Sequence, residues 1–242
     1  MLEDFHAQPA RDRVIVALDC DAATALCLAV QLRGHAKWLK VGMTLYYAEG
    51  PKIVQTLKQL GFNVFLDLKF HDIPHQVEGA AASAVLSGAD MLTMHAVGGS
   101  AMMAAGHRGA EAAAFERKVP VPATLAITVL TSMDAESLAA TGVSRALPEQ
   151  VSSLALQARE AGLSGIVCSP QEASSMRELL GPDAFIVTPG VRPAGSAKGD
   201  QSRVATPAQA FENGASHIVV GRPITQAEDP VAAFEAIAAE LA

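Results

Sequence analysis

Eight short aliphatic runs alternate with longer helical patterns along the chain, and this alternation limits the folds that the chain can adopt. Most of the runs are continuous in Val, Ile and Leu, as the strands of a parallel sheet are when helices cover both faces. The runs occupy residues 13–19, 38–41, 63–68, 91–95, 123–129, 165–168, 185–188 and 217–220.

The segments between these runs predict helices. Several end in a glycine just before the next run, where glycine stops a helix because it tolerates positive φ. Eight βα units predict an α/β fold, a (β/α)₈ or TIM barrel, as one domain over residues 1–242. The rival is a doubly wound dinucleotide-binding sheet, but no G-x-G-x-x-G follows the first run. The helices are expected at 22–32, 51–60, 73–87, 101–117, 148–161, 171–180, 206–213 and 230–241, with long loops at 131–147 and 190–204.

The composition argues against several classes of function. With 242 residues, 50% of them hydrophobic, the chain can bury a core without a disulfide or a structural metal. A net charge of −7 argues against a nucleic-acid polymer as partner. No apolar run reaches the length of a membrane span, and the three cysteines fit no zinc or redox pattern. We therefore expect a cytoplasmic protein without a membrane partner.

Charged residues follow several of the apolar runs, where the catalytic groups of a barrel lie. Asp67 and Lys69 are two residues apart, so on an extended strand they point to the same face. Asp72 lies three residues further on, where a loop could turn it back toward Lys69. Lys40 comes from the neighbouring run and can reach the same pocket. The sequence thus predicts an alternating set of charges formed by Lys40, Asp67, Lys69 and Asp72.

Such a set has a specific chemical consequence. A lysine between two carboxylates stays protonated and can act as a proton donor, while the carboxylates present fixed negative charge. A site that repels a substrate carboxylate and protonates the carbon left behind suits a decarboxylase. The alternative is a structural network of ion pairs that seals the mouth of the barrel.

A second group of residues is typical of phosphate binding. In barrels the phosphate commonly lies at the loops after the seventh and eighth strands. Gly221 lets a backbone approach an anion closely, and Arg222 adds a bidentate donor. Arg192 and Gln201, in the long loop after the seventh run, could cover the same anion. The alternative is an ordinary strand-to-helix turn with a solvated arginine.

The chain resembles the orotidine 5′-phosphate decarboxylase family over nearly its whole length. The segment FLDLKFHDIP at 65–74 is similar to the D-x-K-x-x-D signature of that family. The segments VALD at 16–19, LKVG at 39–42, LTSM at 130–133, TPGVRP at 188–193 and VVGRPIT at 219–225 match further family segments in order and spacing. The resemblance implies decarboxylation of orotidine 5′-monophosphate to UMP, without a cofactor or a metal.

The resemblance also implies roles for the charged set. Lys69 would protonate C6 of the pyrimidine, and Asp67 would lie against the substrate carboxylate. Lys40 would hydrogen-bond the ribose and Asp67, and Asp19 would bind a ribose hydroxyl. Asp72 would complete the site of the other subunit in a homodimer.

The remaining roles concern the two ends of the substrate. Thr131 or Ser132 would contact the pyrimidine, and Gln76 stands where many family members carry a ribose-binding threonine, which leaves its contact open. The 5′-phosphate would be held by Arg192, Gln201, Gly221 and Arg222.

Two other functions remain open at this point. One is a related Mg²⁺-dependent sugar-phosphate decarboxylase or aldolase with the same signature. The other is a non-catalytic nucleotide-binding barrel, which would have no need of two lysines and two aspartates together.

Overall fold

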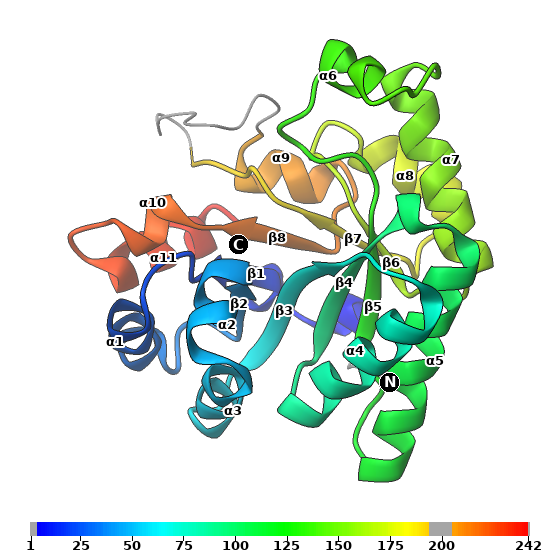
Figure 1. Cartoon of the computed structure of the whole chain (residues 1–242). Coiled ribbons are helices and arrows are strands. Elements are labelled where there is room, and N and C mark those ends of the chain that lie inside the picture. Colours follow the sequence, from blue (N-terminus) through cyan, green and yellow to red (C-terminus); the bar gives the residue numbers. More distant parts are fainter. Residues whose placement is uncertain (1–3, 194–204, 242) are drawn as a thin grey trace.

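Eight parallel strands close into a barrel in the computed structural model, which describes residues 4–193 and 205–241 (Figure 1). Each strand pairs with the strands before and after it in the chain, and β8 closes on β1 through Val14 and Ile218. The predicted (β/α)₈ fold is therefore confirmed. The strands are β1 (Val14–Ala17), β2 (Trp38–Gly42), β3 (Asn63–Phe70), β4 (Met91–His95), β5 (Ala123–Ile127), β6 (Gly165–Val167), β7 (Phe185–Thr188) and β8 (His217–Val220).

Helices pack around the outside of the barrel (Figure 1). All eight predicted helices are present, with ends within two residues of the expected ones. They are α1 (Ala22–Leu32), α3 (Pro51–Gln59), α4 (Pro74–Ser87), α5 (Ser100–Arg117), α7 (Leu147–Glu160), α8 (Ala173–Leu180), α9 (Pro207–Glu212) and α11 (Pro230–Ala239).

Three short helices lie in the connections on the side where the strands end. The helix α2 (Met43–Glu49) was not predicted from the sequence; it starts directly after β2 with no side-chain cap on Gly42. The segment of α6 (Ala135–Ala140) was expected to be loop, although the Asp134 carboxylate accepts a hydrogen bond from the Ser137 amide at its start. The third is α10 (Arg222–Thr225), which begins directly after Gly221.

Apolar side chains fill both the inside of the barrel and the layer between strands and helices. The inner cluster includes Trp38, Phe65 and Met91, all almost completely buried. A barrel packed in this way is a rigid core that holds the strand ends in fixed positions. Within the described ranges, no helix is both long and apolar enough to cross a bilayer.

The end of the barrel where the strands begin is closed by aromatic rings. Phe5 from the N-terminal segment packs edge-on against Phe185 and His217, and His217 stacks on Phe185 with centroids 5.6 Å apart. Burial lowers the pKa of His217 to about 3, and the positive charges of Arg13 and Lys37 act in the same direction. His217 is therefore neutral in the folded protein at neutral pH.

This buried histidine makes stability depend on pH. In the unfolded chain His217 takes up a proton near pH 6.5, whereas in the folded chain it does so only near pH 3. Its contribution is thus fully present above pH 6.5 and is lost as the pH falls toward 3. When the pH is lowered from 7 to 4, the free energy of unfolding should therefore fall by about 3 kcal/mol more in the wild type than in His217→Phe. Urea titrations at both pH values measure this. The exposed-site control His75→Gln should behave like the wild type, and equal losses in all three proteins would contradict the account.

Candidate active site

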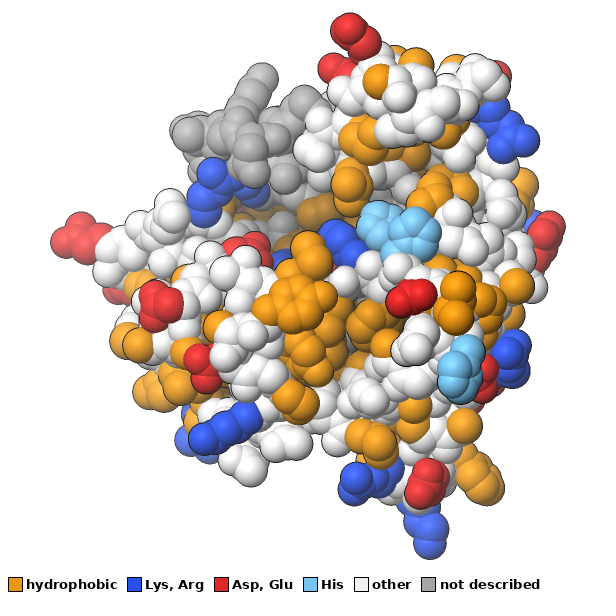
Figure 2. Space-filling view, in the orientation of Figure 1, with side chains coloured by type: hydrophobic (Ala, Val, Ile, Leu, Met, Phe, Trp, Pro, Cys, Tyr) orange, Lys and Arg blue, Asp and Glu red, His pale blue; other side chains and the backbone are white. Residues whose placement is uncertain are grey.

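A cavity of about 720 Å³ opens at the end of the barrel where the strands finish. This volume lies in the range of sites for small molecules. Figure 2 shows the hollow, with acidic and basic side chains inside it. Its floor is apolar, and charged groups enter from opposite sides. The strand residues in this apolar lining are Ala17, Phe65, Ile127, Val167 and Val219.

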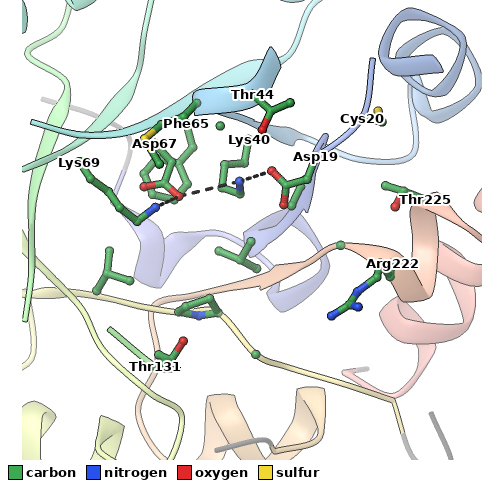
Figure 3. A pocket seen from close by; sticks show the side chains of 18 of the residues that line it. Asp19, Cys20, Lys40, Thr44, Phe65, Asp67, Lys69, Thr131, Arg222 and Thr225 are labelled. Atoms are coloured by element: carbon green, nitrogen blue, oxygen red, sulfur yellow. Dashed lines mark hydrogen bonds and ion pairs between the residues drawn. The ribbon is translucent and has the colours of Figure 1, made fainter. Parts of the chain in front are cut away.

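Four alternating charges form a row along one wall of the cavity (Figure 3). The Lys69 Nζ lies 2.8 Å from the Asp67 Oδ2, and the Lys40 Nζ lies 3.8 Å from the same oxygen. The Lys40 Nζ also donates a hydrogen bond of 2.8 Å to the Asp19 Oδ1. The neighbouring strands β2 and β3 supply Lys40 and Asp67, and Asp19 follows β1. The predicted meeting of Lys40, Asp67 and Lys69 is therefore confirmed.

Asp67 stays ionised although its side chain is only 12% exposed. Burial on its own would raise the pKa of this carboxyl group. The charges of Lys40 and Lys69 outweigh that effect, and hydrogen bonds from Lys69 and Thr93 add to them, so the pKa of Asp67 lies below its usual value. The cavity wall thus carries a fixed negative charge between two ammonium groups.

Lys69 reaches Asp67 through an irregular backbone. Its φ is 54°, in the left-handed region that residues other than glycine rarely adopt. Pairing between β3 and β4 runs regularly to Leu66 and Leu92 and resumes at Phe70 and Met94, so β3 holds two extra residues at this point. The prediction that Lys69 faces Asp67 was right, but the reason given, an extended strand, was wrong.

Thr93, a fully buried residue of β4, was not predicted from the sequence to belong to the site. Its hydroxyl donates a hydrogen bond of 2.9 Å to the Asp67 Oδ1 and accepts one of 3.0 Å from the Lys69 amide. The signal available in the sequence was a single hydroxyl-bearing residue inside the apolar strand MLTMH.

Asp72 does not take the place predicted for it within this chain. It is exposed, and its carboxylate accepts a hydrogen bond from the Ile73 amide rather than turning back to Lys69. The acidic end of the row is instead Asp19. Gln76 is exposed on the first turn of α4, and neither it nor Asp72 is among the described residues that line the cavity.

The opposite side of the cavity carries the predicted phosphate-binding residues. Arg192, Gly221 and Arg222 all line it, and Arg222 lies across the cavity from the row of charges (Figure 3). Thr131 lines the cavity, whereas Ser132 is exposed outside it. Gln201 lies outside the described residues, as does most of the expected loop at 190–204.

Several lining residues were not predicted from the sequence to take part in the site. Met43 and Thr44 lie on α2, the helix that was not predicted. Gly42 is the last residue of β2, and a β-carbon there would come 2.9 Å from the Asp19 Oδ1 and 3.1 Å from the Lys40 Nζ. A glycine here therefore leaves the space in which the Asp19–Lys40 pair forms. The further polar lining consists of Cys20, Thr24, Thr225 and Gln226.

The described carboxylates of the cavity are matched with lysines. Asp19 faces Lys40, and Asp67 faces Lys40 and Lys69. In residues 4–193 and 205–241, no group of three or more His, Cys, Asp or Glu side chains is arranged to hold a metal ion.

Comparison with known proteins gives consistent matches. The model of a family described as "Orotidine 5′-phosphate decarboxylase / HUMPS family" matches residues 12–237. A protein of Moorella thermoacetica named "Orotidine 5′-phosphate decarboxylase" is 52% identical, over 99% of this chain and 96% of its own length. A protein of Cutibacterium acnes with the same name is 51% identical, over 93% and 94%. A crystal structure of this enzyme from Lactobacillus acidophilus is similar with a TM-score of 0.84 and 39% identity, covering 95% of this chain and 99% of that one.

The crowding around Gly42 gives a test of the site's geometry. Gly42→Ala should lower the free energy of unfolding by about 1–3 kcal/mol, because the new methyl group displaces the Asp19–Lys40 pair. Gly79→Ala, in α4, is the matched control: a β-carbon there meets nothing within 4 Å, and alanine favours helix. Denaturant unfolding measures both variants, and a Gly42→Ala protein as stable as the wild type would contradict the crowding.

Proposed function

This chain belongs to the orotidine 5′-phosphate decarboxylase / HUMPS family, and we propose that this carboxy-lyase converts orotidine 5′-monophosphate to UMP and CO₂. This reaction is the last step of de novo UMP biosynthesis. The observation that carries the proposal is the buried, ionised Asp67 held between Lys40 and Lys69 on the wall of the cavity.

Asp67 and Lys69 have complementary tasks in the proposed reaction. A substrate carboxylate bound against Asp67 would meet a like charge, which favours its departure as CO₂. The bond between C6 and the carboxyl carbon breaks, and its electron pair remains on C6. The Lys69 ammonium, 2.8 Å from Asp67, stabilises this developing negative charge and then gives C6 a proton. Lys69 afterwards regains a proton from solvent.

The other lining residues would hold the parts of the substrate that do not react. Arg192 and Arg222 would bind the 5′-phosphate together with the backbone at Gly221, and Gln201 would join them. Binding energy from a remote phosphate can be used to hold the reacting end of a substrate in place.

The polar groups near the reacting end would bind the sugar and the base. Asp19 and Lys40, joined by a hydrogen bond of 2.8 Å, would bind ribose hydroxyls. Thr131 would contact the pyrimidine, since of the two candidates it is the one that lines the cavity. Gln76 is exposed and is not among the described residues that line the cavity. If it contacts a ribose, it would do so in the site of a partner subunit.

We further propose a homodimer in which Asp72 completes the site of the partner. Asp72 is exposed, and Ile73 beside it exposes 62% of its surface. Tyr47 on α2 and Val97 after β4 are also exposed apolar side chains, at 76% and 54%. Figure 2 shows hydrophobic side chains gathered next to the hollow. Apolar surface of this kind beside a charged cavity is typical of an interface between proteins.

The two other functions receive less support. A Mg²⁺-dependent reaction needs carboxylates that are available to a cation, whereas Asp19 and Asp67 are both engaged by Lys40. A non-catalytic nucleotide-binding barrel gives no reason for the left-handed backbone that brings Lys69 to Asp67. The absence of a metal and of a cofactor stays a prediction.

Removing the proposed proton donor tests the reaction. Lys69→Ala should lower kcat/KM for orotidine 5′-monophosphate by at least about 10³-fold, because both the proton donor and its positive charge are lost. The loss of substrate absorbance follows turnover. Lys58→Ala is the matched control: it breaks an ion pair of 2.6 Å with Asp90 outside the cavity and should leave kcat/KM within about 3-fold. A Lys69→Ala enzyme as active as this control would overturn the proposed role.

Mixing two inactive variants tests the shared Asp72. Lys69→Ala and Asp72→Asn should each be inactive as homodimers, but a dimer of one chain of each contains one site with both native residues. After dissociation and reassociation at equal concentrations, about a quarter of the wild-type activity should return. If Asp72 serves its own chain, every site in the mixture lacks one residue and no activity returns.

A further inference from the structure

We propose that Thr93 is a positioning residue for the decarboxylation: its hydroxyl fixes the Lys69 ammonium and the Asp67 carboxylate relative to each other. The inference rests on the proposed function, and it concerns a residue that lies behind the charged row. Thr93 is completely buried and is not among the described lining residues, so it would act through its neighbours and not on the substrate.

The hydroxyl of Thr93 has both of its hydrogen-bonding capacities in use. An ionised carboxylate only accepts hydrogen bonds, so the single hydroxyl proton must point at the Asp67 Oδ1, 2.9 Å away. An oxygen lone pair is then directed to the Lys69 amide, which donates at 3.0 Å. The orientation of the hydroxyl is therefore fixed by the charge of Asp67.

These bonds close a ring through one lysine. The Lys69 amide donates to Thr93, Thr93 donates to one oxygen of Asp67, and the Lys69 ammonium donates to the other oxygen at 2.8 Å. Thr93 thus connects the backbone of Lys69 to the carboxylate that its own side chain contacts. The amide and the ammonium of Lys69 are therefore both held by the Asp67 carboxylate, the amide through Thr93 and the ammonium directly.

The ring lies where regular sheet pairing fails. The β3–β4 register is interrupted between Leu66 and Phe70, so Lys69 has no partner residue of β4 in it. The Lys69 amide donates to the Thr93 hydroxyl instead, and this bond holds Lys69 at a φ of 54°. A buried amide that loses its acceptor is costly, so the backbone would move to find another one. Any such movement would carry the ammonium away from its position beside Asp67.

Three substitutions separate positioning from simple structural support. Thr93→Val keeps the shape of the side chain but replaces the hydroxyl with a methyl group. Thr93→Ala removes the hydroxyl and the methyl group, and Thr93→Ser retains the hydroxyl. The matched control is Thr124→Val on β5, another completely buried threonine, whose hydroxyl pairs with His107 at 2.9 Å on the helix side of the barrel. Thermal unfolding of each purified variant shows whether the fold persists.

Steady-state kinetics with orotidine 5′-monophosphate give the decisive comparison. We expect Thr93→Val and Thr93→Ala to lower kcat at least about 10-fold with KM within about 3-fold, because the reacting end is misplaced while the phosphate end is intact. Thr93→Ser should keep kcat within about 3-fold of the wild type, and Thr124→Val should do the same despite its comparable burial.

Other results would overturn the role of Thr93. These are a kcat of Thr93→Val or Thr93→Ala within about 3-fold of Thr124→Val, a loss confined to KM, or a Thr93→Ser variant as impaired as Thr93→Val. If Thr93→Val does not fold, the same comparison is made with Thr93→Ala. A wild-type enzyme that fails to decarboxylate the substrate would instead refute the proposed function, so the two failures can be told apart.

Discussion

A carboxylate kept charged inside an apolar barrel is the feature on which the whole site depends. Burial disfavours the ionised form of Asp67, and two ammonium groups reverse this preference. Lys40 and Lys69 can do so because β2 and β3 are neighbours in a closed sheet and present both side chains to one edge. The tightly packed interior then prevents the charges from moving apart.

The same site contains the most irregular backbone among the described strands. The two extra residues in β3 and the left-handed conformation of Lys69 are locally unfavourable. Thr93, on the neighbouring strand β4, and Asp67, on β3 itself, hold this backbone in place. Gly42 has a related role on β2, since its lack of a side chain leaves room for the Asp19–Lys40 pair. Thus the neighbours of the charged residues determine the geometry as much as those residues do.

The sequence was sufficient to predict the architecture and much of the site, and the physical reasons can be identified. Strand and helix periodicity, with glycines at helix ends, predicted the barrel, and the charges at strand ends predicted the meeting of Lys40, Asp67 and Lys69. Periodicity carries no signal for a bulge, so the backbone at Lys69 and the contact with Thr93 were missed. Asp72 was placed wrongly within the chain because spacing alone does not show which way a loop turns, and the prediction of one domain over 1–242 stays untested.

The central claim concerns the charge of Asp67, and carbon NMR of the protein with ¹³C-labelled aspartate measures it directly. The Asp67 carboxyl signal can be assigned by its absence in Asp67→Asn and then followed through an acid titration. We expect it to remain ionised below its ordinary pKa of 3.8, or to the lowest pH at which the protein stays folded. Protonation at or above about pH 5, the result of burial without effective lysine neighbours, would contradict the account.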